Sequence, residues 1–100
     1  MADKAWKRFE RRVAKYIGNA ERVPITGRQR GSAPDIEHAW LSIEAKYRAT
    51  LPAWIKDAFS QAKASARANQ APVVIIGEKG DETGKAWICM ELSEFRDRFL

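Results

Sequence analysis

The stretch GSAPDIEHAWLSIEAKYR, residues 31 to 48, decides the fold class, because it places charged side chains within a strand-like pattern. In its second half, apolar side chains recur at every second position, which is the period of a half-buried β-strand. We therefore predict one strand over residues 34–38 and a second over residues 40–47. A tight turn at His38 and Ala39 would join them into a hairpin.

This hairpin would bring charged groups together on one face of the sheet. With that turn, Asp35 lies opposite Ser42, and Glu44 becomes its diagonal neighbour at about 7 to 8 Å. Lys46 follows Glu44 by two residues, so the strand period returns it to the same face. Clustered carboxylates are costly unless a cation or a shared proton compensates their charge. The pattern predicts a site for a hard divalent cation.

The chemistry that fits such a site is phosphodiester hydrolysis. Mg²⁺ takes oxygen ligands and typically uses one or two protein carboxylates together with substrate phosphate. A bound ion lowers the pKa of a water ligand and neutralises charge that builds up in the transition state. Lys46 would either orient the attacking water or stabilise that charge, and the sequence leaves the choice open.

Glu10 is a further candidate, because it falls in the apolar stripe of a predicted first helix. It follows Trp6 by four residues and precedes Val13 by three, where a carboxylate should be avoided unless another group requires it. In one interpretation, basic neighbours on the helix hold it at the rim of the core, namely Lys7, Arg11 or Arg12. The other predicted acids favour a role linked to the metal.

The rest of the chain alternates between helical and strand-like patterns, which predicts one α/β domain over residues 1–100 with the order αβββαββα. The expected helices span residues 4–17, with Asp3 as N-cap, and residues 52–69, with a short final helix capped by Ser93. The remaining strands are expected at residues 22–26, in PVVIIG (72–77) and in AWICMEL (86–92). PVVIIG is apolar without alternation, which is typical of a central strand covered on both sides. We therefore expect one mixed central β-sheet flanked by helices.

Charge is distributed unevenly along the chain. The total is +5, but the first thirty residues hold nine Lys or Arg against three Asp or Glu. A concentrated positive field suits a polyanion such as nucleic acid, although a solvated helix face is the alternative. The candidates for contacts with DNA are Arg8, Arg11, Arg28, Arg30 and Arg48. No apolar run approaches the length of a membrane span, and the single cysteine excludes an internal disulfide, so we expect a cytoplasmic protein.

Pro34-Asp35, followed after a hairpin-sized gap by Glu44-Ala45-Lys46, resembles the motif of the PD-(D/E)xK nuclease superfamily. Within it, the chain most resembles archaeal-type Holliday junction resolvases, which also occur in phages. RFERRVAKYI is similar to the opening helix of that family, GRQRGSAPDI to its flexible loop, and SIEAKYR to its catalytic strand.

The resemblance implies a PD-(D/E)xK core fold. It also implies that the protein acts as a homodimer that cuts four-way DNA junctions with Mg²⁺, and it leaves open whether Mn²⁺ substitutes for Mg²⁺. It also implies a role for each matching residue. Asp35 and Glu44 would be metal ligands and Lys46 the catalytic lysine. Glu10 would be an additional acid near the metal, and Ser32 would lie near the scissile phosphate. Ala45 stands where the family commonly has a larger aliphatic residue.

Aromatic residues exceed what stacking on DNA bases requires. Trp6, Trp54, Phe59 and Trp87 have the periodicity of core residues. The apolar segments of the C-terminal half exceed what one small core can cover, which predicts a twofold dimer interface there. We expect branched DNA as the partner, with no membrane and no small-molecule substrate. The alternatives are another PD-(D/E)xK nuclease, acting on branched, nicked or linear DNA, and a non-catalytic DNA-binding module.

Overall fold

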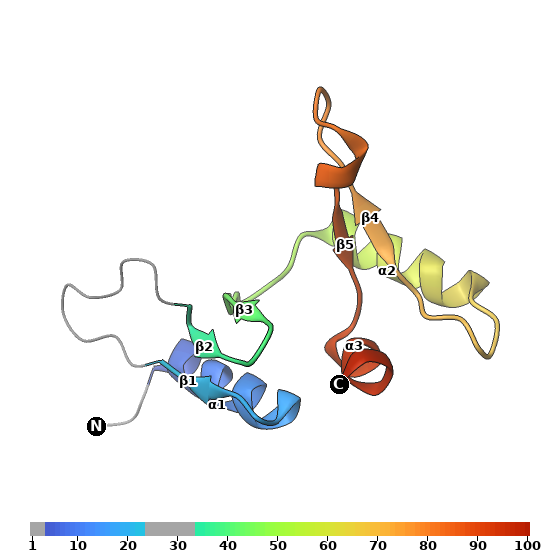
Figure 1. Ribbon diagram of the computed structural model, residues 1–100. Helices are drawn as coiled ribbons and strands as arrows, with labels where there is room; N and C mark the ends of the chain where they lie inside the picture. Colours follow the sequence, from blue (N-terminus) through green and yellow to red (C-terminus); the bar gives the residue numbers. More distant parts are fainter. Residues whose placement is uncertain (1–3, 24–33) are drawn as a thin grey trace. The chain divides into compact units, whose positions relative to one another are not determined.

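The computed structural model describes residues 4–23 and 34–100 (Figure 1). The elements, in chain order, are α1 (Ala5–Ile17), β1 (Glu21–Arg22), β2 (Ile36–Glu37), β3 (Ser42–Ile43), α2 (Ala53–Ser65), β4 (Val74–Ile76), the 3₁₀-helix η1 (Thr83–Lys85), β5 (Trp87–Cys89) and α3 (Leu92–Phe99). This order of helices and strands confirms the α/β class and agrees with the expected αβββαββα. The chain divides into two compact units, Met1–Ala49 and Thr50–Leu100, which are described in turn.

The N-terminal unit packs α1 against an antiparallel sheet with the order β1-β2-β3. Among its described residues, the buried hydrophobic ones are Val13, Ala14 and Ile17 from α1 and Ile36 from β2, which is fully buried. The helix ends at Ile17, and the N–H of the following Gly18, which has a φ of 78°, bonds to the Ala14 carbonyl. The spacing of apolar residues in the sequence therefore predicts the buried face of α1 correctly.

The register between β2 and β3 differs from the predicted one. Ile36 pairs with Ile43 and Glu37 with Ser42, so residues 38–41 form a longer connection than a turn at His38 and Ala39. The paired segments are also shorter than the expected strands. Slipping a strand by two residues keeps every side chain on its face, so alternation in the sequence cannot distinguish the two registers.

The C-terminal unit is built from α2, the β4–β5 hairpin and α3. In the hairpin Val74 pairs with Cys89, Ile75 with Ile88 and Ile76 with Trp87. In the described residues, β4 and β5 make a separate antiparallel sheet rather than joining one mixed sheet. The prediction of a strand covered on both sides is wrong for β4, because Ile75 is 60% exposed.

Two further expectations for the C-terminal unit are also wrong. Glu91 is the N-cap of α3 without a side-chain hydrogen bond, so Ser93 lies inside the helix instead of capping it. Trp54 and Trp87 are 58% and 71% exposed, although their spacing suggested core positions. Trp6 and Phe59 are half-buried. Periodicity identifies the side of an element that an aromatic residue occupies, but does not say whether another element covers that side.

Asp3, the predicted N-cap of α1, lies outside the described residues. In the described part of the chain, no helix has the length and apolar character needed to cross a membrane.

Candidate active site

Glu10 is buried on the sheet-facing side of α1 and is paired with an arginine from β1. Only 4% of Glu10 is exposed. Arg22 donates from Nε to Glu10 Oε1 at 2.6 Å, and its guanidinium lies 5.8 Å from the centre of the Trp6 ring. The apolar stripe thus predicts the burial of Glu10. Its partner comes from the following strand and was missed, because pairing across the fold leaves no periodic signal in the sequence.

Asp35 is also buried, with 3% of its surface exposed. Its Oδ2 accepts a hydrogen bond from the backbone N–H of Ala45 at 2.8 Å. The β2–β3 register, continued by one residue, would put Asp35 opposite Glu44, but the Asp35 N–H donates to the Ile43 carbonyl at 2.9 Å. The hydrogen-bond pairing between the two strands is therefore irregular at Asp35. Irregular pairing of this kind changes the direction in which a side chain points, compared with a regular strand.

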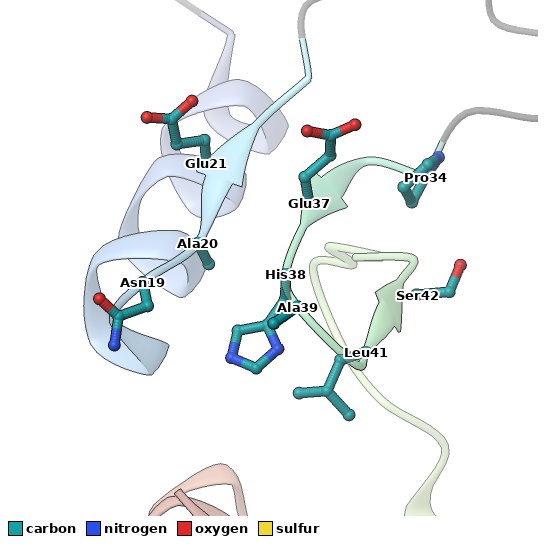
Figure 2. A pocket seen from close by; sticks show the side chains of 9 residues that line it. All are labelled: Asn19, Ala20, Glu21, Pro34, Glu37, His38, Ala39, Leu41 and Ser42. Atoms are coloured by element: carbon teal, nitrogen blue, oxygen red, sulfur yellow. The ribbon is translucent and has the colours of Figure 1, made fainter.

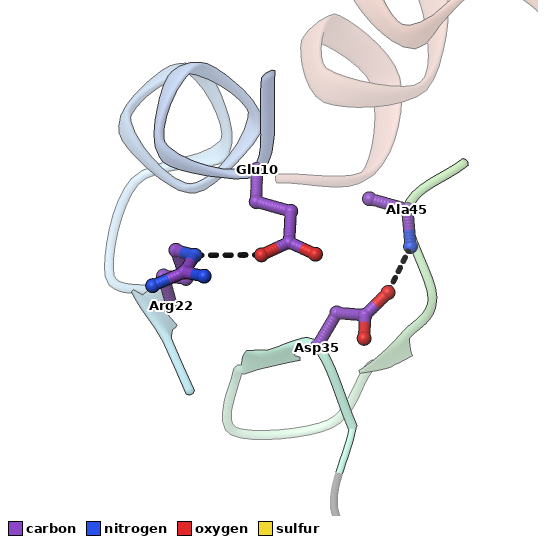
Figure 3. Close-up of polar contacts among 4 residues, drawn as sticks. All are labelled: Glu10, Arg22, Asp35 and Ala45. Atoms are coloured by element: carbon purple, nitrogen blue, oxygen red, sulfur yellow. Dashed lines mark hydrogen bonds and ion pairs between the residues drawn. The ribbon is translucent and has the colours of Figure 1, made fainter. Parts of the chain in front are cut away.

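The two buried carboxylates point into the same space between α1 and the sheet, with Arg22 on one side and Ala45 on the other (Figure 3). Burying a carboxylate is costly unless a cation or hydrogen-bond donor compensates it. The guanidinium does this for Glu10, and a backbone N–H contributes for Asp35. Carboxylate oxygens are also the donors that Mg²⁺ prefers, so the chemistry of this pair fits a hard cation.

Glu44 and Lys46 are exposed, while the alternating residues Ile43 and Ala45 are half-buried against the core. Glu44 and Lys46 thus project from the opposite side of this segment from the core. The structure brings Glu10 and Asp35 together and does not bury Glu44 or Lys46 with them. Within residues 4–23 and 34–100, no group of three His, Cys, Asp or Glu is arranged to hold a metal ion.

A basic face covers the side of α1 away from the core. It consists of the exposed residues Lys4, Arg8, Arg11, Arg12 and Lys15. Arg12 also lies over aromatic rings, 5.8 Å from the centres of both Phe9 and Tyr47. Arg48 is exposed as well. Three of the candidate residues, Arg28, Arg30 and Ser32, lie outside the described residues.

An open hollow of about 870 Å³ lies elsewhere on the N-terminal unit (Figure 2). Glu21 and Glu37, which pair across β1 and β2, line it together with His38. Figure 2 shows the His38 ring directed away from the two carboxylates. His38 Nδ1 accepts a hydrogen bond from the Trp40 N–H at 3.4 Å, as expected of a turn residue. Glu10 and Asp35 do not line this hollow.

Comparison of the chain with models of protein families, with curated proteins and with solved structures finds no match.

Proposed function

We propose that this protein is a metal-dependent endodeoxyribonuclease of the PD-(D/E)xK type that resolves four-way DNA junctions. One observation carries the proposal: Asp35, an acid of the sequence motif, and Glu10, which the resemblance places near the metal, are both buried with their carboxylates facing one space. A small core normally excludes carboxylates, so placing two together indicates a use for them.

Glu10 and Asp35, whose carboxylates face one space, would hold Mg²⁺ or Mn²⁺. Glu44 is exposed on the other side of its segment, so it would have to turn toward them to become the third ligand. When bound, the ion would lower the pKa of a water ligand and offset charge on the phosphate. The Ala45 N–H fixes one oxygen of Asp35, and Arg22 fixes one oxygen of Glu10. Lys46 is exposed on the same side as Glu44, so the same movement would bring it to the metal, where it would orient the attacking water or stabilise negative charge on the phosphate.

The basic face of α1 supports DNA as the substrate, because lysine and arginine side chains neutralise phosphates without reading sequence. A homodimer is part of the same proposal, since a twofold assembly would supply one active site for each of two nicks. Large exposed apolar residues in the C-terminal unit support it, among them Ile75, Ile88 and Phe99. The PD-(D/E)xK core and a cytoplasmic location belong to this proposal too.

A non-catalytic DNA-binding module is the second candidate, and the buried Arg22–Glu10 ion pair favours it. In that case Glu10 serves only to hold α1 on the sheet, and the basic face binds DNA whether or not a metal is present. Another nuclease of the same superfamily would use the same acids on nicked, flapped or linear DNA, so only a panel of substrates separates it from a junction resolvase.

The test is cleavage of a labelled immobile four-way junction and of its component linear duplex, in Mg²⁺ or EDTA. Asp35→Asn should lower the cleavage rate at least about 100-fold, because a lost ligand removes several kcal/mol of transition-state stabilisation. Asparagine retains an oxygen that can accept from the Ala45 N–H, so circular dichroism should show an intact fold. Asp57→Asn, on the exposed surface of α2, is the matched control and should cut normally.

Paired symmetric nicks on the junction alone, lost with EDTA or Asp35→Asn, support a resolvase. Equal cleavage of the junction and the linear duplex would identify a nuclease without junction selectivity. Tight binding with no cutting in any divalent metal would overturn the catalytic proposal in favour of the binding module.

A further inference from the structure

A second hollow, of about 470 Å³, lies entirely within the C-terminal unit. Trp54 at the start of α2 and Trp87 of β5 line it, together with charged residues from the segment that joins β4 to β5. Its volume falls within the range of about 300 to 1,000 Å³ that is typical of ligand clefts. None of the acids proposed to bind metal, Glu10, Asp35 and Glu44, belongs to this unit.

Both tryptophans are exposed, and both line the same hollow. Trp54 is 58% exposed and Trp87 is 71% exposed. An indole ring offers a large flat surface that stacks on any nucleobase, and proteins that bind single strands use such rings as stacking platforms. The two rings therefore provide apolar contact area for a flat aromatic ligand.

Two lysines lie beside the rings. Lys79 occupies a turn closed by the hydrogen bond from the Asp81 N–H to the Glu78 carbonyl at 3.1 Å, with Gly80 at a φ of 94°. Lys85 ends η1. Both side chains are exposed, and within the described part of the chain neither forms a hydrogen bond or an ion pair. Their ammonium groups remain available for phosphate oxygens.

Glu78 and Asp81 complete the charged lining of the hollow. Carboxylates repel phosphate, but they accept hydrogen bonds from exocyclic amino groups such as N4 of cytosine. Aromatic rings and carboxylates alone would also suit an organic cation, yet two unpaired lysines in the same lining oppose a cationic ligand. Stacking surface, ammonium donors and carboxylate acceptors together match a base attached to a phosphate.

We infer that this hollow holds one unstacked nucleobase of a DNA strand, with Trp54 and Trp87 stacking on the base and Lys79 and Lys85 contacting adjacent phosphates. The inference rests on the proposed function, because a branch point exposes bases that have lost a stacking neighbour. It assigns the C-terminal unit a binding role separate from cleavage. Glu78 and Asp81 favour bases that carry an amino group, so cytosine is preferred over thymine.

The experiment measures binding of labelled single-stranded dC and dT octamers to the full-length protein in EDTA, where cleavage cannot interfere. Trp54→Ala or Trp87→Ala should weaken binding of the dC octamer by about 5- to 100-fold, the usual effect of removing one stacking partner. Trp40→Ala is the matched control, because Trp40 is 60% exposed but lies in the N-terminal unit. It should bind like the unaltered protein. Free dCMP and tetramethylammonium serve as competitors.

Unchanged affinity in both the Trp54→Ala and Trp87→Ala proteins would overturn the inference. So would binding of dCMP as tight as that of the octamer, which would assign the hollow to a free nucleotide, or displacement of the octamer by tetramethylammonium. Failure of the inference can be told apart from failure of the proposed function. If Asp35→Asn abolishes cleavage while the tryptophan variants bind normally, the proposed function stands and only the inference about the hollow is lost. If no cleavage occurs but these variants lose binding, the hollow still binds DNA.

Discussion

The buried ion pair between Glu10 and Arg22 shows what single residues contribute to this site. Its two side chains are 5% and 14% exposed, so solvent screens the pair little. From the sequence, Glu10 could be recognised as an acid in an apolar stripe, and Asp35 and Glu44 as acids in strand-like segments. The role of Arg22 could not, because it depends on how β1 lies against α1. The approach of Glu10 to Asp35 depends on the same packing.

Arg22→Ala should lower the free energy of unfolding by about 3 to 5 kcal/mol, because it leaves the Glu10 carboxylate buried without its charged partner. Urea unfolding followed by circular dichroism measures this. Arg98→Ala is the matched control, since it removes an exposed ion pair with Glu94 within α3 and should cost only about 0.3 to 0.5 kcal/mol. Equal effects of the two substitutions would mean that Glu10 is solvated in solution and that the space between α1 and the sheet is open to water.

The elements of the two units differ in burial: α1 and β2 contain buried residues, whereas the helices and strands of the C-terminal unit contain none. Helix α1 buries Glu10, Val13, Ala14 and Ile17, whereas no residue of α2 is buried. Both helices could be predicted from the spacing of apolar residues, because that spacing is a local property. The register of β2 and β3 and the isolation of the β4–β5 hairpin could not, since they depend on contacts between segments distant in sequence.

Ile36→Ala should lower the free energy of unfolding by about 2 to 5 kcal/mol, because Ile36 is fully buried between α1 and the sheet. Leu51→Ala removes a side chain that is 54% exposed and should change stability by no more than about 0.5 kcal/mol. Thermal or urea unfolding of the two variants compares them directly. A small effect of Ile36→Ala would place the core of the N-terminal unit somewhere other than at β2.

For the whole molecule, the uneven distribution of charge has the clearest functional meaning. The basic face of α1 agrees with the excess of lysine and arginine in the first thirty residues, a property readable from composition alone. Composition does not say which of these residues face solvent. The structure adds that the basic face and the buried Glu10 lie on opposite sides of α1.

The double variant Arg8→Ala/Arg11→Ala should reduce the magnitude of the salt slope of DNA binding by up to about 1.8, given a slope near −0.9 for each phosphate neutralised on duplex DNA. Affinity measured on linear duplex at several salt concentrations in EDTA gives this slope. Lys56→Ala/Arg67→Ala removes the same charge from exposed positions in the C-terminal unit and should leave the slope nearly unchanged. Equal slopes for the two double variants would contradict a dedicated role for α1.

The division of the chain at Ala49 also bears on how the protein is made. Every buried residue of the described structure lies in the first 49 residues, including Glu10 and Asp35. The same unit contains the half-buried Arg22 that pairs with Glu10 and the Ala45 N–H that binds Asp35. Domains generally fold as units during synthesis, with the N-terminal part first. The acids of the proposed active site can therefore meet their partners while the ribosome is still translating the C-terminal unit.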